Sequence, residues 1–228
     1  LVANKIINNN VMGHKPGMHA GGIKLINAVN TTVEKNYVLD NEGAGIWVDI
    51  GSNGVEVHHN VIVETKNVDG LQARGIQYEM SSGNRSPEKL DIHNNILRVD
   101  GGVAGIISIY ALNSQYLEIF RNTISGAQNG IVVKQDSRGY AGNCANGYSG
   151  CISCSGSNYD QSCDNNCIAG GNNIDEPAGA RCMQQIREIK VYYNDISVGG
   201  SGYLLTGLLV EPGPGQTGIE PNGITPER

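Results

Sequence analysis

Residues 57–62 read VHHNVI and residues 92–97 read IHNNIL, and this phrase, apolar-x-x-Asn-x-apolar, recurs along the chain. Further copies are VEKNYV at 33–38, IFRNTI at 119–124 and VYYNDI at 191–196, with a degenerate copy at Leu1, Asn4 and Ile6. Each copy is followed by a second phrase that opens with Gly-Ile or Gly-Leu. The second phrases begin at Gly22, Gly45, Gly75, Gly105, Gly130 and Gly207.

The pattern predicts stacked coils of short strands. Runs with alternating apolar residues are typical of strands. Asn between two strands tolerates the left-handed backbone conformation of a sharp bend, and Asn side chains stacked on successive coils would hydrogen-bond to one another. A repeat of about 24 to 35 residues with three short strands is one coil of a parallel β-helix. The helical spacing of ankyrin and tetratricopeptide repeats is absent, as is the leucine-rich-repeat signature.

The two phrases resemble those of the pectate-lyase-like superfamily of right-handed β-helices. The resemblance covers roughly residues 1–138 and resumes near 189, and it is sharpest with secreted, mostly uncharacterised bacterial β-helix proteins, in phrases such as GIWVD at 45–49 and GIQYE at 75–79. It implies that the Gly-Ile strands form the floor of a polysaccharide groove and that the Asn bend is the second turn of each coil. The Cys-rich segment departs from this pattern.

The expected fold is therefore all-β: a right-handed parallel β-helix of about six coils with an Asn ladder. We expect one domain over residues 1–210, a Cys-rich insertion at about 136–188, and a Pro/Gly-rich tail or linker at 211–228. Because the chain opens on Leu1 within the repeat, we expect a processed or truncated chain.

The composition restricts the partners. Gly contributes 32 of 228 residues, and Trp and Phe occur once each, which disfavours long helices and a core built on large rings. The net charge of −6 disfavours nucleic acid and leaves glycans open. No apolar run approaches the roughly 18 residues that would span a bilayer.

All six cysteines fall in the insertion, within a segment rich in Gly, Ser and Asn. Such clustering favours disulfides and an oxidising, extracellular compartment, although Cys-x-x-Cys spacing also suits a metal site. The pairing stays open among the 15 that six cysteines allow. The cysteines are Cys144, Cys151, Cys154, Cys163, Cys167 and Cys182.

Strand alternation separates two faces of the Gly-Ile strands. Ile46, Val48, Ile76 and Tyr78 are expected to face inward, and the polar residues between them to be exposed on the groove floor. The expected outward residues are Lys24, Trp47, Asp49, Gln77, Glu79 and Lys134, with Ile107 and Ile109 between them.

Asp49 and Glu79 are the predicted catalytic pair. They occupy equivalent positions on adjacent coils, and neighbouring strands lie about 4.8 Å apart, a spacing close to that of the two carboxylates of a retaining glycosidase. Trp47 is expected to stack on a sugar ring, and Lys24 to neutralise Asp49 or a uronate. The other predicted substrate contacts are Gln77, His19, Lys134 and Arg138.

Alternatives remain open. Elimination at a uronate would need a base and a cation, with Lys24, Lys134 or Arg138 in the cationic role, and Asp49 and Glu79 as possible Ca²⁺ ligands. The acidic residues are not dense enough to predict a metal site, so we expect no cofactor. A second class is a non-catalytic subunit of a surface layer or filament, self-associating through the β-helix ends, or a glycan-binding adhesion module. His58 and His93, beside the Asn bend, are expected to be solvated turn residues.

Overall fold

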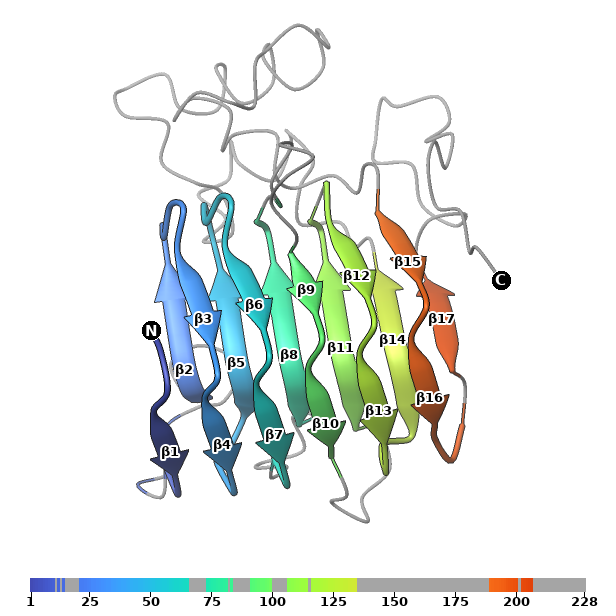
Figure 1. Cartoon of the computed structure of the whole chain (residues 1–228), viewed down its shortest axis with the longest axis horizontal. Helices are drawn as coiled ribbons and strands as arrows, with labels where there is room; N and C mark the ends of the chain where they lie inside the picture. Colours follow the sequence, from blue (N-terminus) through green and yellow to red (C-terminus); the bar gives the residue numbers. More distant parts are fainter. Residues whose placement is uncertain are drawn as a thin grey trace, which may run out of the picture.

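The computed structural model describes residues 1–10, 12, 14, 21–65, 73–81, 83, 91–99, 106–114, 116–134, 189–200 and 202–206. Within these residues the chain forms short strands that stack into three parallel sheets around one apolar core (Figure 1). The strands of each sheet follow one another along the long axis of the molecule in sequence order, as expected for a β-helix.

We name the sheets A, B and C. Sheet A contains β3 (Thr32–Glu34), β6 (Glu56–His58), β9 (Ile92–His93), β12 (Glu118–Phe120) and β15 (Lys190–Tyr192). Sheet B contains β1 (Lys5–Ile7), β4 (Tyr37–Leu39), β7 (Val61–Val63), β10 (Ile96–Arg98), β13 (Thr123–Ser125) and β16 (Asp195–Ser197). Sheet C contains β2 (Gly21–Ile26), β5 (Ala44–Asp49), β8 (Arg74–Glu79), β11 (Ile107–Leu112), β14 (Asn129–Lys134) and β17 (Tyr203–Thr206).

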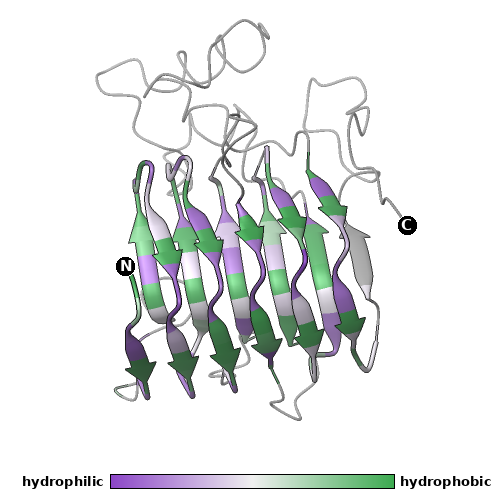
Figure 2. Ribbon diagram, in the orientation of Figure 1, coloured by the Kyte–Doolittle hydropathy of each residue, from purple (hydrophilic) through white to green (hydrophobic). Residues whose placement is uncertain are grey.

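Each coil runs from sheet A to sheet B to sheet C, and equivalent apolar residues stack in register from coil to coil. Val33 pairs with Val57 in sheet A, and Ile46 pairs with Ile76 in sheet C. Hydrophobic segments accordingly recur at similar levels in neighbouring strands (Figure 2). Tyr78 faces inward as predicted, its hydroxyl donates to the carbonyl of Val55, and burial raises the pKa of Tyr78.

The predicted Asn ladder is confirmed. At each bend between sheets A and B except the last, the side-chain amide donates to the Oδ1 of the Asn on the next coil, at 2.9–3.0 Å. Asn60, for example, also donates to the Val33 carbonyl and accepts from the backbone and side chain of Asn36. The members of the ladder are Asn4, Asn36, Asn60, Asn95, Asn122 and Asn194.

The expectation that the ladder Asn itself takes the left-handed conformation is wrong. The positive φ belongs to the residue before it, with φ of 55° at Lys35, 54° at His59 and 51° at Arg121. The left-handed residue turns the chain, and the Asn that follows points its amide into the stack. Here, therefore, Asn is used for its hydrogen-bonding capacity rather than for its backbone tolerance.

A second ladder, of serines, lies where the chain passes from sheet C to sheet A. The Ser81 hydroxyl donates to the Glu79 carbonyl, and the backbone N–H of Ser81 donates to the Ser114 hydroxyl on the next coil. Ser52 accepts from the Ala28 N–H and donates to the Asp49 carbonyl in the same way. These hydroxyls satisfy backbone groups that the corner would otherwise leave buried and unpaired.

Two of the Gly-Ile phrases were placed in the wrong register. Ile109, not Ile106, pairs with Ile76 and Ile131, so Ser108 occupies the glycine row in the fourth of these strands and Ile109 faces inward. In the last strand Tyr203 pairs with Ile131, so Gly202 takes the place predicted for Gly207. Both true positions lack the Gly-Ile or Gly-Leu pair that marks the other strands: they read Ser108-Ile109 and Gly202-Tyr203.

The predictions for the Cys-rich insertion at about 136–188, for its six cysteines and for the tail at 211–228 concern residues outside the described part of the chain. They remain predictions.

Replacing Asn60 by Ala should lower the free energy of unfolding by about 3 kcal/mol, because it leaves several buried backbone and amide groups without partners. Asn4→Ala, at a partly exposed rung of the same ladder, should cost about 1 kcal/mol. Urea denaturation of both variants checks this, and equal losses would contradict the cooperative role of the ladder.

Gly75→Ala should lower stability by about 1–3 kcal/mol through overpacking. The added Cβ would lie 2.6 Å from the Ser108 carbonyl oxygen and 2.7 Å from Leu97 Cδ2. Ser108→Ala, in the same row, should change stability by less than about 1 kcal/mol or increase it, because the buried Ser108 hydroxyl has no hydrogen-bond partner among the described residues. Thermal unfolding of the two variants measures the difference, and a Gly75→Ala variant as stable as the parent would contradict the packing argument.

Candidate functional site

The outer face of sheet C carries two columns of side chains set by the strand register. Lys24 pairs with Trp47 and Trp47 with Gln77, while Ile26 pairs with Asp49. Glu79 lies two residues beyond Gln77, as Asp49 lies beyond Trp47, so the two carboxylates occupy equivalent positions on adjacent coils. The sequence prediction of this juxtaposition agrees with the register.

The predicted exposure of this face is wrong. Only 4% of Asp49, 5% of Glu79 and 2% of Trp47 is accessible to solvent. The columns continue into a buried apolar cluster on the same face. Its members are Ile107, Tyr110, Leu112 and Val132. The expectation assumed that every outward position of a soluble β-helix meets water, but here the polar and apolar outward side chains pack together and are covered.

The expected partner of Asp49 is confirmed. Lys24 Nζ lies 2.8 Å from Asp49 Oδ2 and 3.3 Å from the centroid of the Trp47 ring. The ammonium therefore neutralises the carboxylate and covers the indole face that was expected to meet a sugar. The Trp47 Nε1–H is buried and has no hydrogen-bond partner among the described residues, although buried indole N–H groups usually find one.

Arg74 also belongs to this face, although the sequence pattern did not predict it as a site residue. Its guanidinium carbon lies 4.2 Å from the centroid of the Tyr110 ring, and its Nη1 donates to Gln77 Oε1 at 2.6 Å. Gln77 in turn donates to the Glu79 carboxylate. Simple alternation from Ile76 would turn Arg74 inward, but Gly75 faces the core next to Ile76 and shifts the phase. An arginine directly before a Gly-Ile pair was the signal available in the sequence.

The remaining predicted contacts are less central. Lys134 is half-buried and lies in the same column as Asp49 and Glu79. Its register partner is Leu112 and not either carboxylate. His19 and Arg138 lie outside the described residues, so their predicted contacts stay predictions.

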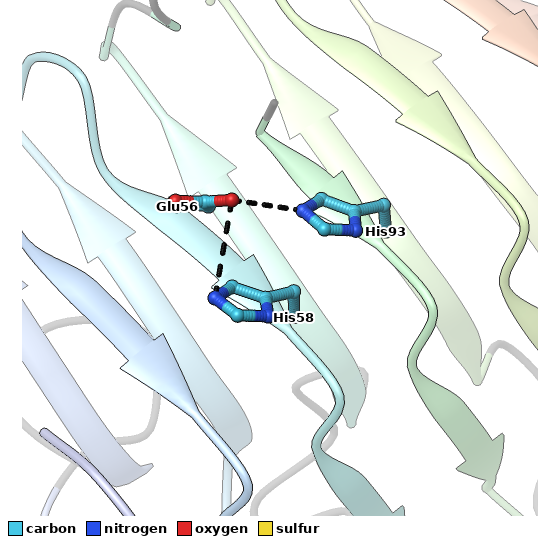
Figure 3. A group of neighbouring side chains, drawn as sticks. All are labelled: Glu56, His58 and His93. Atoms are coloured by element: carbon cyan, nitrogen blue, oxygen red, sulfur yellow. Dashed lines mark hydrogen bonds and ion pairs between the residues drawn. The ribbon is translucent and has the colours of Figure 1, made fainter. Parts of the chain in front are cut away.

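A second cluster lies on the outer face of sheet A, where Glu56, His58 and His93 meet (Figure 3). His93 Nε2 is 2.9 Å and His58 Nε2 is 3.9 Å from the same Glu56 oxygen, Oε1. The two imidazoles are stacked with centroids 4.9 Å apart and planes within 2° of parallel. His93 is 5% exposed, and burial lowers the pKa of His58, so the expectation of solvated turn residues is wrong.

Residues 1–108 match the family described as right handed beta helix region. This match and the three parallel sheets fit a right-handed parallel β-helix, and the pectate-lyase-like superfamily is consistent with it. No curated protein and no solved structure matches the chain. The described part of the chain contains no helix of the length and apolarity needed to cross a membrane.

Lys24→Met should destabilise the protein by about 3 kcal/mol, because it leaves the buried Asp49 carboxylate without its ammonium partner. The double variant Lys24→Met/Asp49→Asn should recover most of this loss, since no unpaired charge remains. A double-mutant cycle of unfolding free energies tests the pair, and strictly additive losses would show that the two side chains do not interact.

Proposed function

We propose that this protein is an extracellular carbohydrate-active protein that cleaves a polysaccharide on the outer face of sheet C. The observation that carries the proposal is the register of Asp49 and Glu79, two buried carboxylates in equivalent positions on adjacent coils. Strand spacing puts their backbones about 4.8 Å apart, close to the roughly 5–5.5 Å between the two carboxyl groups of a retaining glycosidase.

The free-energy cost of burying these charged and polar side chains supports a catalytic role for them. Lys24, Asp49, Gln77 and Glu79 occupy buried or nearly buried outward positions that apolar residues could fill, as Tyr110 and Leu112 do on the strand next to that of Gln77 and Glu79. Replacing a buried ion pair by apolar residues is often neutral or stabilising. Buried charges gathered in one place are therefore candidates for function.

The contacts suggest distinct roles for the two carboxylates. Asp49 contacts the Lys24 ammonium and would act as nucleophile or base. Glu79, the other carboxylate of the pair, would act as the acid that protonates the leaving oxygen. The Lys24 ammonium could move from the indole of Trp47 to an acidic sugar, which would free the ring face for stacking.

Substrate would reach the pair from the side of β2. Ile26, which pairs with Asp49 in the register, is 55% exposed, whereas Leu112, which pairs with Glu79 on the opposite side, is buried. The first coil thus offers the more open approach among the described residues. A glycan bound there would meet Lys24 before it met Glu79.

Incubation with a panel of neutral and uronate polysaccharides tests the proposal, with reducing ends and the absorbance of unsaturated products followed together. Asp49→Asn and Glu79→Gln should each lower the rate at least about 100-fold, the scale of general acid–base catalysis. Unsaturated ends would assign elimination, and their absence with new reducing ends would assign hydrolysis.

Glu118→Gln is the matched control, because Glu118 is an outward carboxylate on sheet A that contacts Lys190 and Tyr192 instead. Its activity should equal that of the parent. A folded parent protein that cleaves nothing in the panel, or Asp49→Asn and Glu79→Gln variants that retain full activity, would reject the proposed catalytic pair.

A further inference from the structure

The outer face of sheet A carries a column of rings that changes its chemistry along the stack. His58 pairs with His93, His93 with Phe120, and Phe120 with Tyr192. Each neighbouring pair of rings is stacked, with centroids 4.9–5.0 Å apart. Stacking alone needs no nitrogen, as Phe120 and Tyr192 demonstrate. At the two imidazoles, however, a carboxylate stands against the Nε2 edge of both rings (Figure 3).

From these contacts we infer that Glu56, His58 and His93 form a binding site for a divalent transition-metal ion such as Zn²⁺. One ligand atom of each residue lies within 4.8 Å of the other two. A tetrahedral Zn²⁺ with bonds of about 2.0–2.1 Å holds its ligand atoms about 3.3 Å apart. The two Glu56–histidine distances, 2.9 and 3.9 Å, lie on either side of that value. Two imidazoles and one carboxylate are a ligand set that Zn²⁺ uses with a fourth, open position.

The groups around His58 favour a bound cation over a histidine that only stacks on its neighbouring ring. His58 Nδ1 lies 2.7 Å from Nδ1 of His59, so one of the two nitrogens donates to the other. When His58 is the donor, its Nε2 carries a lone pair that faces two carboxylates, Glu56 at 3.9 Å and Glu34 at 3.7 Å. Both distances exceed a hydrogen bond. A metal ion between these groups would replace the repulsion of lone pairs by coordination.

The site also has the second shell that a metal ligand needs. A histidine bound to metal through Nε2 keeps its proton on Nδ1 and donates it to a neighbour. His59 is placed to accept from His58. The Asn94 amide nitrogen Nδ2 lies 2.9 Å from Nδ1 of His93, and a half-turn of that amide when metal binds would place its oxygen there to accept from Nδ1–H. Glu56 keeps 28% of its side chain exposed, which leaves an entry path from solvent.

Zn²⁺ binding by isothermal titration calorimetry, with Co²⁺ absorption as a second probe, tests the inference on the whole chain. His93→Phe should weaken the site more than about 100-fold, since loss of a second-shell partner alone costs about 10–100-fold. Phenylalanine already occupies this column at Phe120, so the stack should persist. Glu56→Gln should weaken binding with no change to the rings.

His14→Asn is the control for adventitious binding, because His14 is an exposed histidine outside the cluster. All variants keep the six cysteines, so metal held by thiolates would be common to every protein and would show a thiolate-to-Co²⁺ charge-transfer band. The expected result is one Zn²⁺ present in the parent and in His14→Asn, lost in His93→Phe and weakened in Glu56→Gln, with Zn²⁺ raising the melting temperature only where it binds.

No Zn²⁺ uptake by the parent, or equal uptake and affinity in the parent, His93→Phe and Glu56→Gln, would overturn the inference and leave the histidines as rungs of a ring stack. If His93→Phe unfolds, the comparison of the parent with Glu56→Gln decides in the same way. Because the site lies on sheet A, its outcome is independent of cleavage on sheet C.

Discussion

A primary amide inside a stack can donate and accept at the same time, and this property of Asn underlies the fold. At each inner bend from sheet A to sheet B one Asn accepts from its neighbour on one side and donates to its neighbour on the other, as Asn95 does between Asn60 and Asn122. Each amide is also bonded to a backbone carbonyl, so the bend is tied to the coil on either side. With the bend fixed, the strands that follow it are held in one register.

That register decides which side chains meet, because a slip by one residue would exchange the inner and outer faces of a strand. It stacks Val57 on Val33 and Ile76 on Ile46 in the core. The same alignment brings Asp49 beside Glu79 on one outer face and His58 beside His93 on another. Both candidate sites therefore lie on adjacent coils of one repeat, and each depends on the pairing of the coils rather than on a dedicated loop.

Features that depend on neighbouring residues in the sequence could be predicted, and features that depend on contacts between coils could not. Short-range patterns, the Asn phrases and the inward positions of Ile46 and Tyr78, were predictable because each is written within a few residues. Two strand positions were placed wrongly, because Ser108 and Gly202 stand where a Gly-Ile pair marks other coils. The burial of Asp49 and the approach of His93 to Glu56 were also missed. Those features depend on what lies against a face and on residues 37 apart in sequence, which no local pattern reports.

The left-handed residue before each ladder Asn has a further consequence. A left-handed conformation costs an ordinary residue about 1–2 kcal/mol, and the bend repeats it on six coils, at Ala3, Lys35, His59, Asn94, Arg121 and Tyr193. This backbone conformation disfavours β-branched side chains, and none of the six residues is β-branched. Within that limit the side chain varies widely, from a methyl group to a lysine, an imidazole and a phenol. The six side chains therefore form a row whose chemical character can change from one coil to the next. The left-handed backbone beneath them and the Asn ladder beside them stay the same.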